Sequence, residues 1–208
     1  GAIVAPLTDF ARRLGWLTLP VLALVGLYKV SDISMAAMAN PLYIDLGFSL
    51  SQIGAISGLF GVAMTILGGL FGGVVVARFG LMRMLIAGAI GVCITNLMFA
   101  WLATQGPQMW ALALTITADN FFVGFSATVF IAWLSSLVSL RYTATQYALL
   151  SSFMTLPGKV LGGPTGYMED QSGYVFFFVY ASALGIPAVV LSIYLMRHQL
   201  PQASVEES

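Results

Sequence analysis

Six long apolar runs follow one another along the chain, and short polar or glycine-containing breaks separate them. A membrane-spanning helix needs about 20 consecutive, mainly apolar residues, and each run is long enough to supply them. The pattern therefore predicts six transmembrane helices. We place these helices at residues 14–39, 51–77, 81–103, 108–138, 146–168 and 174–196.

Two of the breaks end in a helix-start signal. Ser49 with Gln52, and Thr143 with Gln146, both fit the capping box, in which two side chains satisfy backbone N–H groups of the first turn. We expect the second and fifth helices to begin at these signals.

The composition is typical of a protein in a bilayer. Of the 208 residues, 59% are hydrophobic and 8% are charged, and the mean hydropathy is +0.94. A soluble domain carries about 25% charged residues. The formal net charge is zero, so no basic surface indicates a nucleic-acid partner. The expected fold class is an all-α membrane protein, with the lipid bilayer as its surroundings.

The basic residues in the breaks orient the predicted bundle. Every second break and both ends of the bundle are basic, whereas the other breaks carry Asp45, Glu169 and Asp170. By the positive-inside rule, the basic side faces the cytoplasm. We therefore expect a cytoplasmic lead-in at 1–13, which lacks a signal-peptide pattern, a bundle at 14–197 and a cytoplasmic tail at 198–208. The basic residues concerned are Arg12, Arg13, Arg78, Arg83, Arg141 and Arg197.

Four charged side chains fall within the predicted helices, near the middle of the bilayer. A charge at that depth costs at least about 2.5–3.5 kcal/mol, so each one needs a reason. Lys29 and Asp32 are three residues apart and share a helix face. They form either a structural ion pair or part of a polar cavity for substrate or protons, and we favour the cavity. Asp119 lies in the fourth helix beside Asn120, which points about 100° away from it.

The fifth predicted helix carries the remaining charge, Lys159, directly after Pro157 and Gly158. Proline removes a backbone donor and disrupts the preceding turn, so we expect a helix break here. Broken helices in transporters supply binding groups at the midplane. The alternative is a kink that serves packing, with Lys159 reaching toward the membrane surface.

Residue types that mark other chemistry are missing from the sequence. The one histidine, His198, follows the last apolar run, and the one cysteine, Cys93, lies inside an apolar run. The sequence contains no HExxH, GxSxG or Walker A motif. We therefore expect neither an enzyme nor a metal or other cofactor.

The stretch GGVVVARFGLMR, between the second and third helices, resembles the major facilitator signature G-x-L-A-D-R-x-G-R-R. Ala77 stands where that signature has Asp, and Leu81 where it has Arg. The resemblance implies a gating role for this loop. The candidate gating residues are Gly73, Arg78, Gly80 and Arg83, together with Pro157 and Gly158 at the expected helix break.

Longer stretches, among them RYTATQYALLSS, resemble the C-terminal half of the AmpG-type anhydromuropeptide permeases over nearly the whole chain. That resemblance implies proton-coupled import of N-acetylglucosaminyl-anhydro-N-acetylmuramyl peptides across the bacterial inner membrane for cell-wall recycling. It also implies a partner, the N-terminal six-helix half, because six helices are one repeat of a twelve-helix transporter. The implied substrate and proton pathway contains Lys29, Asp32, Asp119, Asn120 and Lys159, and the glycine-rich second helix would face the seam between the halves.

Two other functions stay open at this stage. The permease family includes relatives that transport acetyl-CoA, so the substrate could be another anionic solute. A structural or regulatory membrane subunit that does not transport is the alternative from a different class.

Overall fold

The computed structural model describes residues 4–139, 141–162 and 165–198, and their regular structure is helical. This confirms the predicted all-α fold class. In chain order the elements are α1 (Val4–Leu14), η1 (Gly15–Leu17), α2 (Thr18–Leu27), α3 (Val30–Asp45), α4 (Leu50–Ile56), η2 (Ser57–Gly61), α5 (Val62–Phe79), α6 (Leu81–Leu102), α7 (Met109–Leu137), α8 (Thr143–Gly162), α9 (Thr165–Ala183) and α10 (Ile186–Arg197).

Five helical segments of the described chain are long and apolar enough to cross a membrane. They correspond to five of the six predicted helices. The predicted helix at 146–168 maps onto α8 and the start of α9, and it is not among the five. The segments are Val4–Asp45, Leu50–Phe79, Leu81–Leu102, Met109–Leu137 and Ser172–Arg197.

The breaks inside the helices differ from the expected ones. The first span is interrupted at Tyr28 and Lys29, between α2 and α3, and the second contains a π-helical turn, η2. In contrast, α8 continues through Pro157, so the break expected there is wrong. Pro157 lies against Gly26, where an added Cβ would be 3.1 Å from the proline ring. The proline therefore serves close packing of α8 on the first span, and the helix tolerates the single lost backbone donor.

One of the two predicted capping boxes is present. Ser49 caps α4 reciprocally with Gln52, as expected. The box predicted at Thr143 is wrong, because α8 already includes Thr143 and the Gln146 side chain accepts a hydrogen bond from the backbone N–H of Ser139 at 2.7 Å. The long-range contacts of Gln146 described below compete successfully with the local cap.

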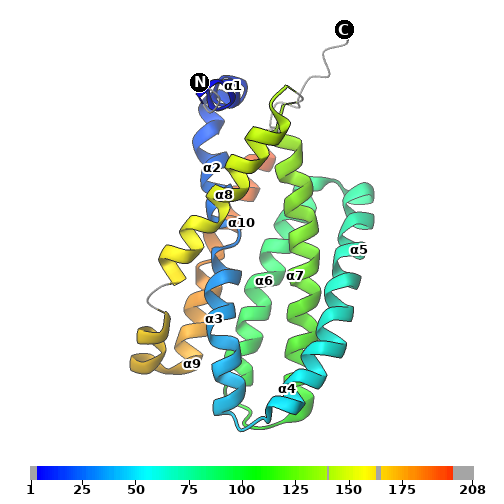
Figure 1. The fold of residues 1–208 in the computed structure, drawn as a ribbon, viewed down its shortest axis with the longest axis vertical. Coiled ribbons are helices and arrows are strands. Elements are labelled where there is room, and N and C mark those ends of the chain that lie inside the picture. The colour runs from blue at the N-terminus through cyan, green and yellow to red at the C-terminus, as the bar shows by residue number, and fades with distance from the viewer. Residues whose placement is uncertain (1–3, 140, 163–164, 199–208) are drawn as a thin grey trace.

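Helices from the first half of the chain pack against helices from the second half. The second span, through α5, packs most extensively on α7, and α8 packs on both parts of the first span, α2 and α3. The third span, α6, contacts α7, α9 and α10. Figure 1 shows α3, α5, α6 and α7 running along the long axis, with α8 crossing α2 obliquely. Thus α5 packs on a helix from the second half of the chain and α8 on helices from the first half, which suits a bundle made of two related repeats.

The crossing of α5 and α7 depends on glycine. A Cβ added at Gly68 would collide with the backbone oxygen of Phe121, and one added at Gly124 would collide with the backbone oxygen of Thr65. On the same span, Gly54, Gly58 and Gly73 are exposed and have open space around them. The glycines of the second span are thus divided between a tight crossing inside this chain and an outer face.

The predicted lead-in is a helix, α1, which lies across one end of the bundle (Figure 1). Its buried residues are four apart and form one face, Pro6, Phe10 and Leu14. Gln146, only 2% exposed, fixes α1 to α8 by donating hydrogen bonds to the backbone oxygen of Pro6 at 2.9 Å and to Asp9 at 3.0 Å. Arg13 in turn donates to the backbone oxygen of Leu137 at 2.9 Å and to Gln146 at 3.2 Å.

Replacing Gln146 with Ala is expected to release α1 from the bundle. The change removes hydrogen bonds that involve charged groups and leaves Arg13 and Asp9 with fewer partners, a cost of about 1.5–3 kcal/mol. Trypsin cleavage after Arg12 and Arg13 should then become about tenfold faster or more, because local opening controls access to the bond.

Gln108→Ala is the matched control for this experiment, since Gln108 is exposed and lies between α6 and α7, away from α1. Equal cleavage rates in Gln146→Ala and Gln108→Ala would contradict the role assigned to Gln146.

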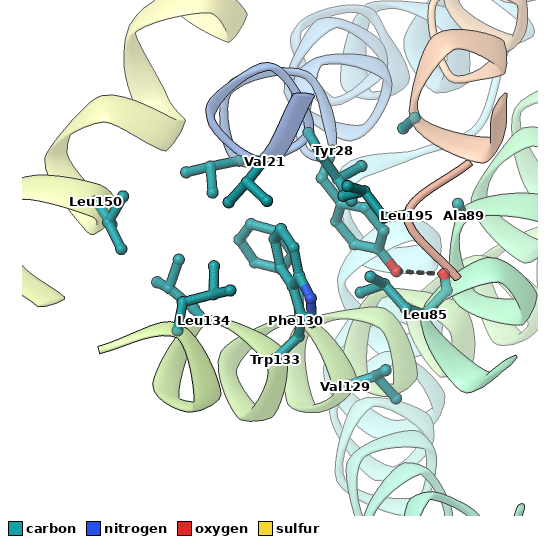
Figure 2. Close-up of a cluster of buried hydrophobic side chains, with 14 of the residues drawn as sticks. Val21, Tyr28, Leu85, Ala89, Val129, Phe130, Trp133, Leu134, Leu150 and Leu195 are labelled. Carbon is teal, nitrogen blue, oxygen red and sulfur yellow. Dashed lines mark hydrogen bonds between the residues drawn. The ribbon is translucent and has the colours of Figure 1, made fainter. Parts of the chain in front are cut away.

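The buried apolar residues form two clusters, one toward each end of the bundle. The cluster nearer α1 contains Trp133 and Phe130 at its centre, with Val21 and Leu150 on opposing helices (Figure 2). The other cluster centres on Phe99, Phe177 and Phe178. The residues between the two clusters form a middle layer that is richer in polar side chains.

Candidate functional site

Polar and charged side chains gather in the layer between the two apolar clusters. The helices α6 and α7 pass from one cluster to the other at this layer. On α7, for example, Ile116 belongs to the cluster farther from α1 and Phe125 to the nearer one, and Asp119 lies between them. The buried or partly buried polar residues of this layer are Lys29, Ser31, Asp32, Ser34, Thr95, Asn96, Asp119, Asn120, Ser126 and Ser182.

The break between α2 and α3 places a charge pair in this layer. Lys29 Nζ lies 2.8 Å from Asp32 Oδ2, and the two side chains are only 14% and 16% exposed. Lys29 follows the C-terminus of α2 and Asp32 lies in the first turn of α3, so both charges complement the helix dipoles. The pairing expected from their spacing is therefore present, on a helix junction that the sequence did not predict.

The break itself is held by an aromatic side chain. The Tyr28 hydroxyl donates a hydrogen bond to the backbone oxygen of Leu85 on α6 at 3.0 Å (Figure 2). Its ring stacks on Phe130 of α7, with centroids 4.5 Å apart. Lys29 also reaches α7, where its ammonium donates to Ser126 Oγ at 3.4 Å. Three helices thus fix the position of the lysine.

Asp119 of α7 is the second carboxylate of the cluster, and it is 9% exposed. The charges that act on it are those of Asp32 and Lys29, and Thr95 of α6 lies beside it, with its hydroxyl donating to the backbone oxygen of Val92 at 3.1 Å. Lys29 is the lysine whose charge acts on Asp119, but its ion pair within the described residues is with Asp32, so a direct pairing of Asp119 with a lysine stays a prediction. The cluster contains one cation and two carboxylates.

Asn120 points about 100° around α7 from Asp119, toward the second span and away from this cluster. Its side-chain oxygen accepts a hydrogen bond from Thr65 at 3.2 Å, and its amide donates to the backbone oxygen of Ile116 at 2.9 Å. It also lies 3.4 Å from the position of a Cβ built on Gly61, the last residue of the π-helical turn. Asn120 therefore joins α7 to the second span and does not enter the charge cluster.

Lys159 lies at the level of the same layer but on the outside of this chain. Gly158 packs against Ile33, one residue after Asp32, which fixes the height of Lys159 along the bundle. The Lys159 side chain is exposed, and no ion pair involves it within the described residues. The structure thus brings together three of the four charges predicted to lie in the membrane and leaves Lys159 apart from them.

The candidate gating loop joins α5 to α6 at the end of the bundle where α1 lies (Figure 1). Gly80 has a φ of +89°, a conformation that favours glycine, and it forms the turn. Arg78 and Arg83 are both exposed, and the Arg78 guanidinium lies 5.7 Å from the centre of the Phe79 ring. Gly73 faces open space on α5.

Thr95, Asn96 and Ser182 are among the residues of the polar layer that the sequence analysis did not single out. Asn96 is fully buried and donates to Ser31 Oγ at 2.6 Å, and Ser31 donates to the backbone oxygen of Ala181 at 2.6 Å. Ser182 donates to the backbone oxygen of Cys93 at 2.8 Å. These bonds tie α3, α6 and α9 together. Thr95 and Asn96 are polar residues near the middle of the third predicted helix, and that position could have identified them from the sequence.

Comparison with known proteins agrees with this architecture. The family model of the Major Facilitator Superfamily matches residues 22–208. A putative transporter AmpG 4 of Rickettsia felis is 34% identical over 196 residues, which is 94% of this chain and 47% of the relative. The anhydromuropeptide permease of Escherichia coli K12 is 29% identical over 210 residues, covering all of this chain and 42% of the relative.

The chain therefore spans about half the length of the curated relatives it matches. Its polar layer, its helical bundle and the match over most of its length lead to one assignment. The chain belongs to the major facilitator superfamily, and its relatives include AmpG-type transporters.

Proposed function

We propose that this chain is the C-terminal six-helix half of a proton-coupled transporter that imports anhydromuropeptides into the cytoplasm. The observation that carries the proposal is the cluster of Lys29, Asp32 and Asp119, buried between two apolar cores. Intramembrane charges are retained where a substrate or proton pathway needs them. The name of the Escherichia coli relative supports the substrate class.

The charge balance of the cluster suits proton coupling. With both carboxylates ionised, one cation faces two anions, and the cluster carries a net charge of −1. Uptake of one proton makes it neutral, and a neutral cluster costs less to hold in a medium of low dielectric. A movement that exposes the cluster first to one side of the membrane and then to the other would carry that proton across.

Uptake in proteoliposomes tests the proposal, with the complete transporter reconstituted and an inward proton gradient imposed. We expect accumulation of a labelled anhydromuropeptide, and we expect a protonophore to abolish it. Accumulation of acetyl-CoA in place of the muropeptide would indicate that acetyl-CoA is the substrate of the transporter. No accumulation of either, by protein that is folded and inserted, would favour the non-transporting subunit.

A second six-helix half is proposed to cover the outer face of the second span. This face is apolar, and its exposed residues alternate with the open glycines Gly54, Gly58 and Gly73. Small residues allow helices to approach closely within a membrane. The large apolar side chains exposed on this face are Leu59, Phe60, Val62, Ile66, Leu67, Leu70, Phe71 and Val74.

The arginines support a cytoplasmic location for both ends of the described chain. The segments that carry them, namely α1, the end of α5, the start of α6, the turn before α8 and the end of α10, lie at one end of the bundle (Figure 1). By the positive-inside rule that end faces the cytoplasm. Labelling of single cysteines, placed in a Cys93→Ser background at Arg83 in the first turn of α6 and at Thr104 in the loop after α6, would test this orientation from each side of the membrane.

Replacing Lys159 with Ala is expected to weaken substrate binding. The carboxylates of a muropeptide need a cation near the midplane, and Lys159 is the exposed one at that level. Loss of a charge-assisted hydrogen bond of about 1.5–3 kcal/mol corresponds to a rise in KM of about tenfold or more. Transport kinetics over a range of substrate concentrations would measure the change.

Arg141→Ala is the comparison for this variant, because Arg141 lies in the loop before α8 and not in the polar layer. We expect that change to affect mainly expression or topology, with KM unaltered. An unchanged KM for Lys159→Ala would mean that a residue other than Lys159 supplies the cation that binds the substrate.

A further inference from the structure

A pocket of about 230 Å³ lies between α1, α2 and α8, away from the charge cluster. Its lining is almost entirely apolar, and two of its residues on α1, Leu7 and Ala11, are exposed. The pocket therefore opens beside α1. The apolar residues that line it are Leu7, Phe10, Ala11, Leu22, Leu149 and Leu150.

The two polar residues at the pocket, Thr18 and Gln146, are already engaged. The Thr18 hydroxyl donates to the backbone oxygen of Gly15 at 2.7 Å. The Gln146 amide donates to Pro6 and Asp9, and its oxygen accepts from Ser139 and Arg13. A trapped water needs two to four polar partners, and an apolar cavity of about 150 Å³ is known to stay dry and to bind hydrocarbon. The pocket is larger than that, so its chemistry suits a hydrocarbon ligand.

The pocket lies at the boundary between membrane and water. It is formed where α1 crosses the end of the bundle (Figure 1), and α1 is amphipathic, with Val4 and Leu7 exposed on its apolar side. Trp16, in the short helix η1 that follows α1, is 63% exposed, and exposed tryptophans are typical of this boundary. Acyl chains are the abundant hydrocarbon at this depth.

The positive charge at this end of the bundle favours lipids with an anionic headgroup. Arg12 follows Ala11 on α1 and is exposed, whereas Arg13 is paired with Asp9 at 3.2 Å. The other described arginines lie at this end as well, and Asp9 is the acidic residue that the structure describes there. A basic surface next to a membrane attracts anionic lipids.

We infer that this pocket binds one acyl chain of an anionic phospholipid from the leaflet on the α1 side, with Arg12 beside the phosphate. This site is separate from the proposed transport pathway. The lipid chain fills the gap between α1 and α8.

Native mass spectrometry of the full chain tests the site, after purification in detergent supplemented with phosphatidylglycerol or phosphatidylcholine. We expect one retained phosphatidylglycerol in the unmodified protein and its loss in Ala11→Phe, which fills the pocket. Ala5→Phe is the matched control, because Ala5 is also exposed on α1 but does not line the pocket. Leu22→Phe fills the pocket from α2 and should give the same loss if Ala11→Phe fails to fold.

Arg12→Gln tests the headgroup. One arginine near an anionic surface contributes about 1 kcal/mol, so the preference for phosphatidylglycerol over phosphatidylcholine should fall about fivefold. Equal lipid retention in the unmodified protein, Ala11→Phe and Leu22→Phe would overturn the proposal. It would also be overturned if the unmodified protein retained no lipid, since detergent or another protein segment would then occupy the pocket.

Discussion

Replacing Asp119 with Asn should abolish the uphill, proton-driven uptake of substrate while leaving exchange of substrate down its gradient measurable. Asparagine keeps the size of the side chain, but it cannot carry a proton. The remaining pair, Lys29 with Asp32, is neutral by itself. Accumulation should therefore fall at least tenfold, which corresponds to about 1.4 kcal/mol of lost coupling.

Asp32→Asn should have a further effect, because it leaves Lys29 without its 2.8 Å partner. Removing one member of a buried ion pair costs about 3–5 kcal/mol, so this variant should lose stability as well as coupling. The double variant Lys29→Gln with Asp32→Asn should recover stability without recovering accumulation. That difference separates the electrostatic role of the pair from its proposed part in transport.

Asp45→Asn is the control for these carboxylates, since Asp45 lies at the end of α3 outside the polar layer and pairs with the Tyr174 hydroxyl. It should accumulate substrate normally. If Asp32→Asn and Asp119→Asn also accumulated substrate at the unmodified level, the carboxylates would have structural roles only. The two rate measurements, with and without a proton gradient, distinguish this result from simple misfolding.

The charge cluster shows which features of the site could be inferred from sequence. Lys29 and Asp32 are three residues apart, so local helix geometry predicts their contact. The depth of Asp119, together with the cost of exposing a charge to lipid, predicts that it turns inward toward another charge. Both inferences use only spacing and transfer energy, which is why the structure agrees with them.

The helix breaks could not be inferred in the same way. The break at Tyr28 and Lys29 contains neither proline nor glycine, and it is held by the hydrogen bond to Leu85, 57 residues away along the chain. Pro157 lies in the opposite situation, because its packing against Gly26 supports a continuous α8. Tertiary contacts decide both cases, and local sequence does not contain them.

The position of Lys159 illustrates a related difficulty. The contact of Gly158 with Ile33 places Lys159 at the level of α3, but the direction of its side chain depends on how α8 rotates against α3. That rotation is set by the close contact of Gly158 with Ile33, which turns Lys159 outward. The packing of the amphipathic lead-in helix α1 could not be predicted from local sequence either, because it depends on Gln146, more than 130 residues later in the chain.

The glycines of the second span allow a direct test of which face packs inside this chain. Gly68→Ala is expected to destabilise the bundle strongly, because the added Cβ would meet the backbone oxygen of Phe121, and backbone cannot move aside as a flexible side chain can. Overpacking of this kind costs about 1–3 kcal/mol or more. Gly73→Ala, on the same helix but in open space, should be neutral or slightly stabilising.

Both substitutions gain the same helix propensity, about 1 kcal/mol for alanine over glycine, so their difference isolates the crossing of α5 with α7. The thermal midpoint of the detergent-purified protein, followed by the loss of the monodisperse peak in size-exclusion chromatography, should be several degrees lower for Gly68→Ala than for Gly73→Ala. Gly124→Ala should behave like Gly68→Ala, since its Cβ would meet the backbone oxygen of Thr65 from the other helix. Equal midpoints for Gly68→Ala and Gly73→Ala would mean that α5 does not cross α7 at these glycines, and the position of Asn120 against the second span would then be wrong as well.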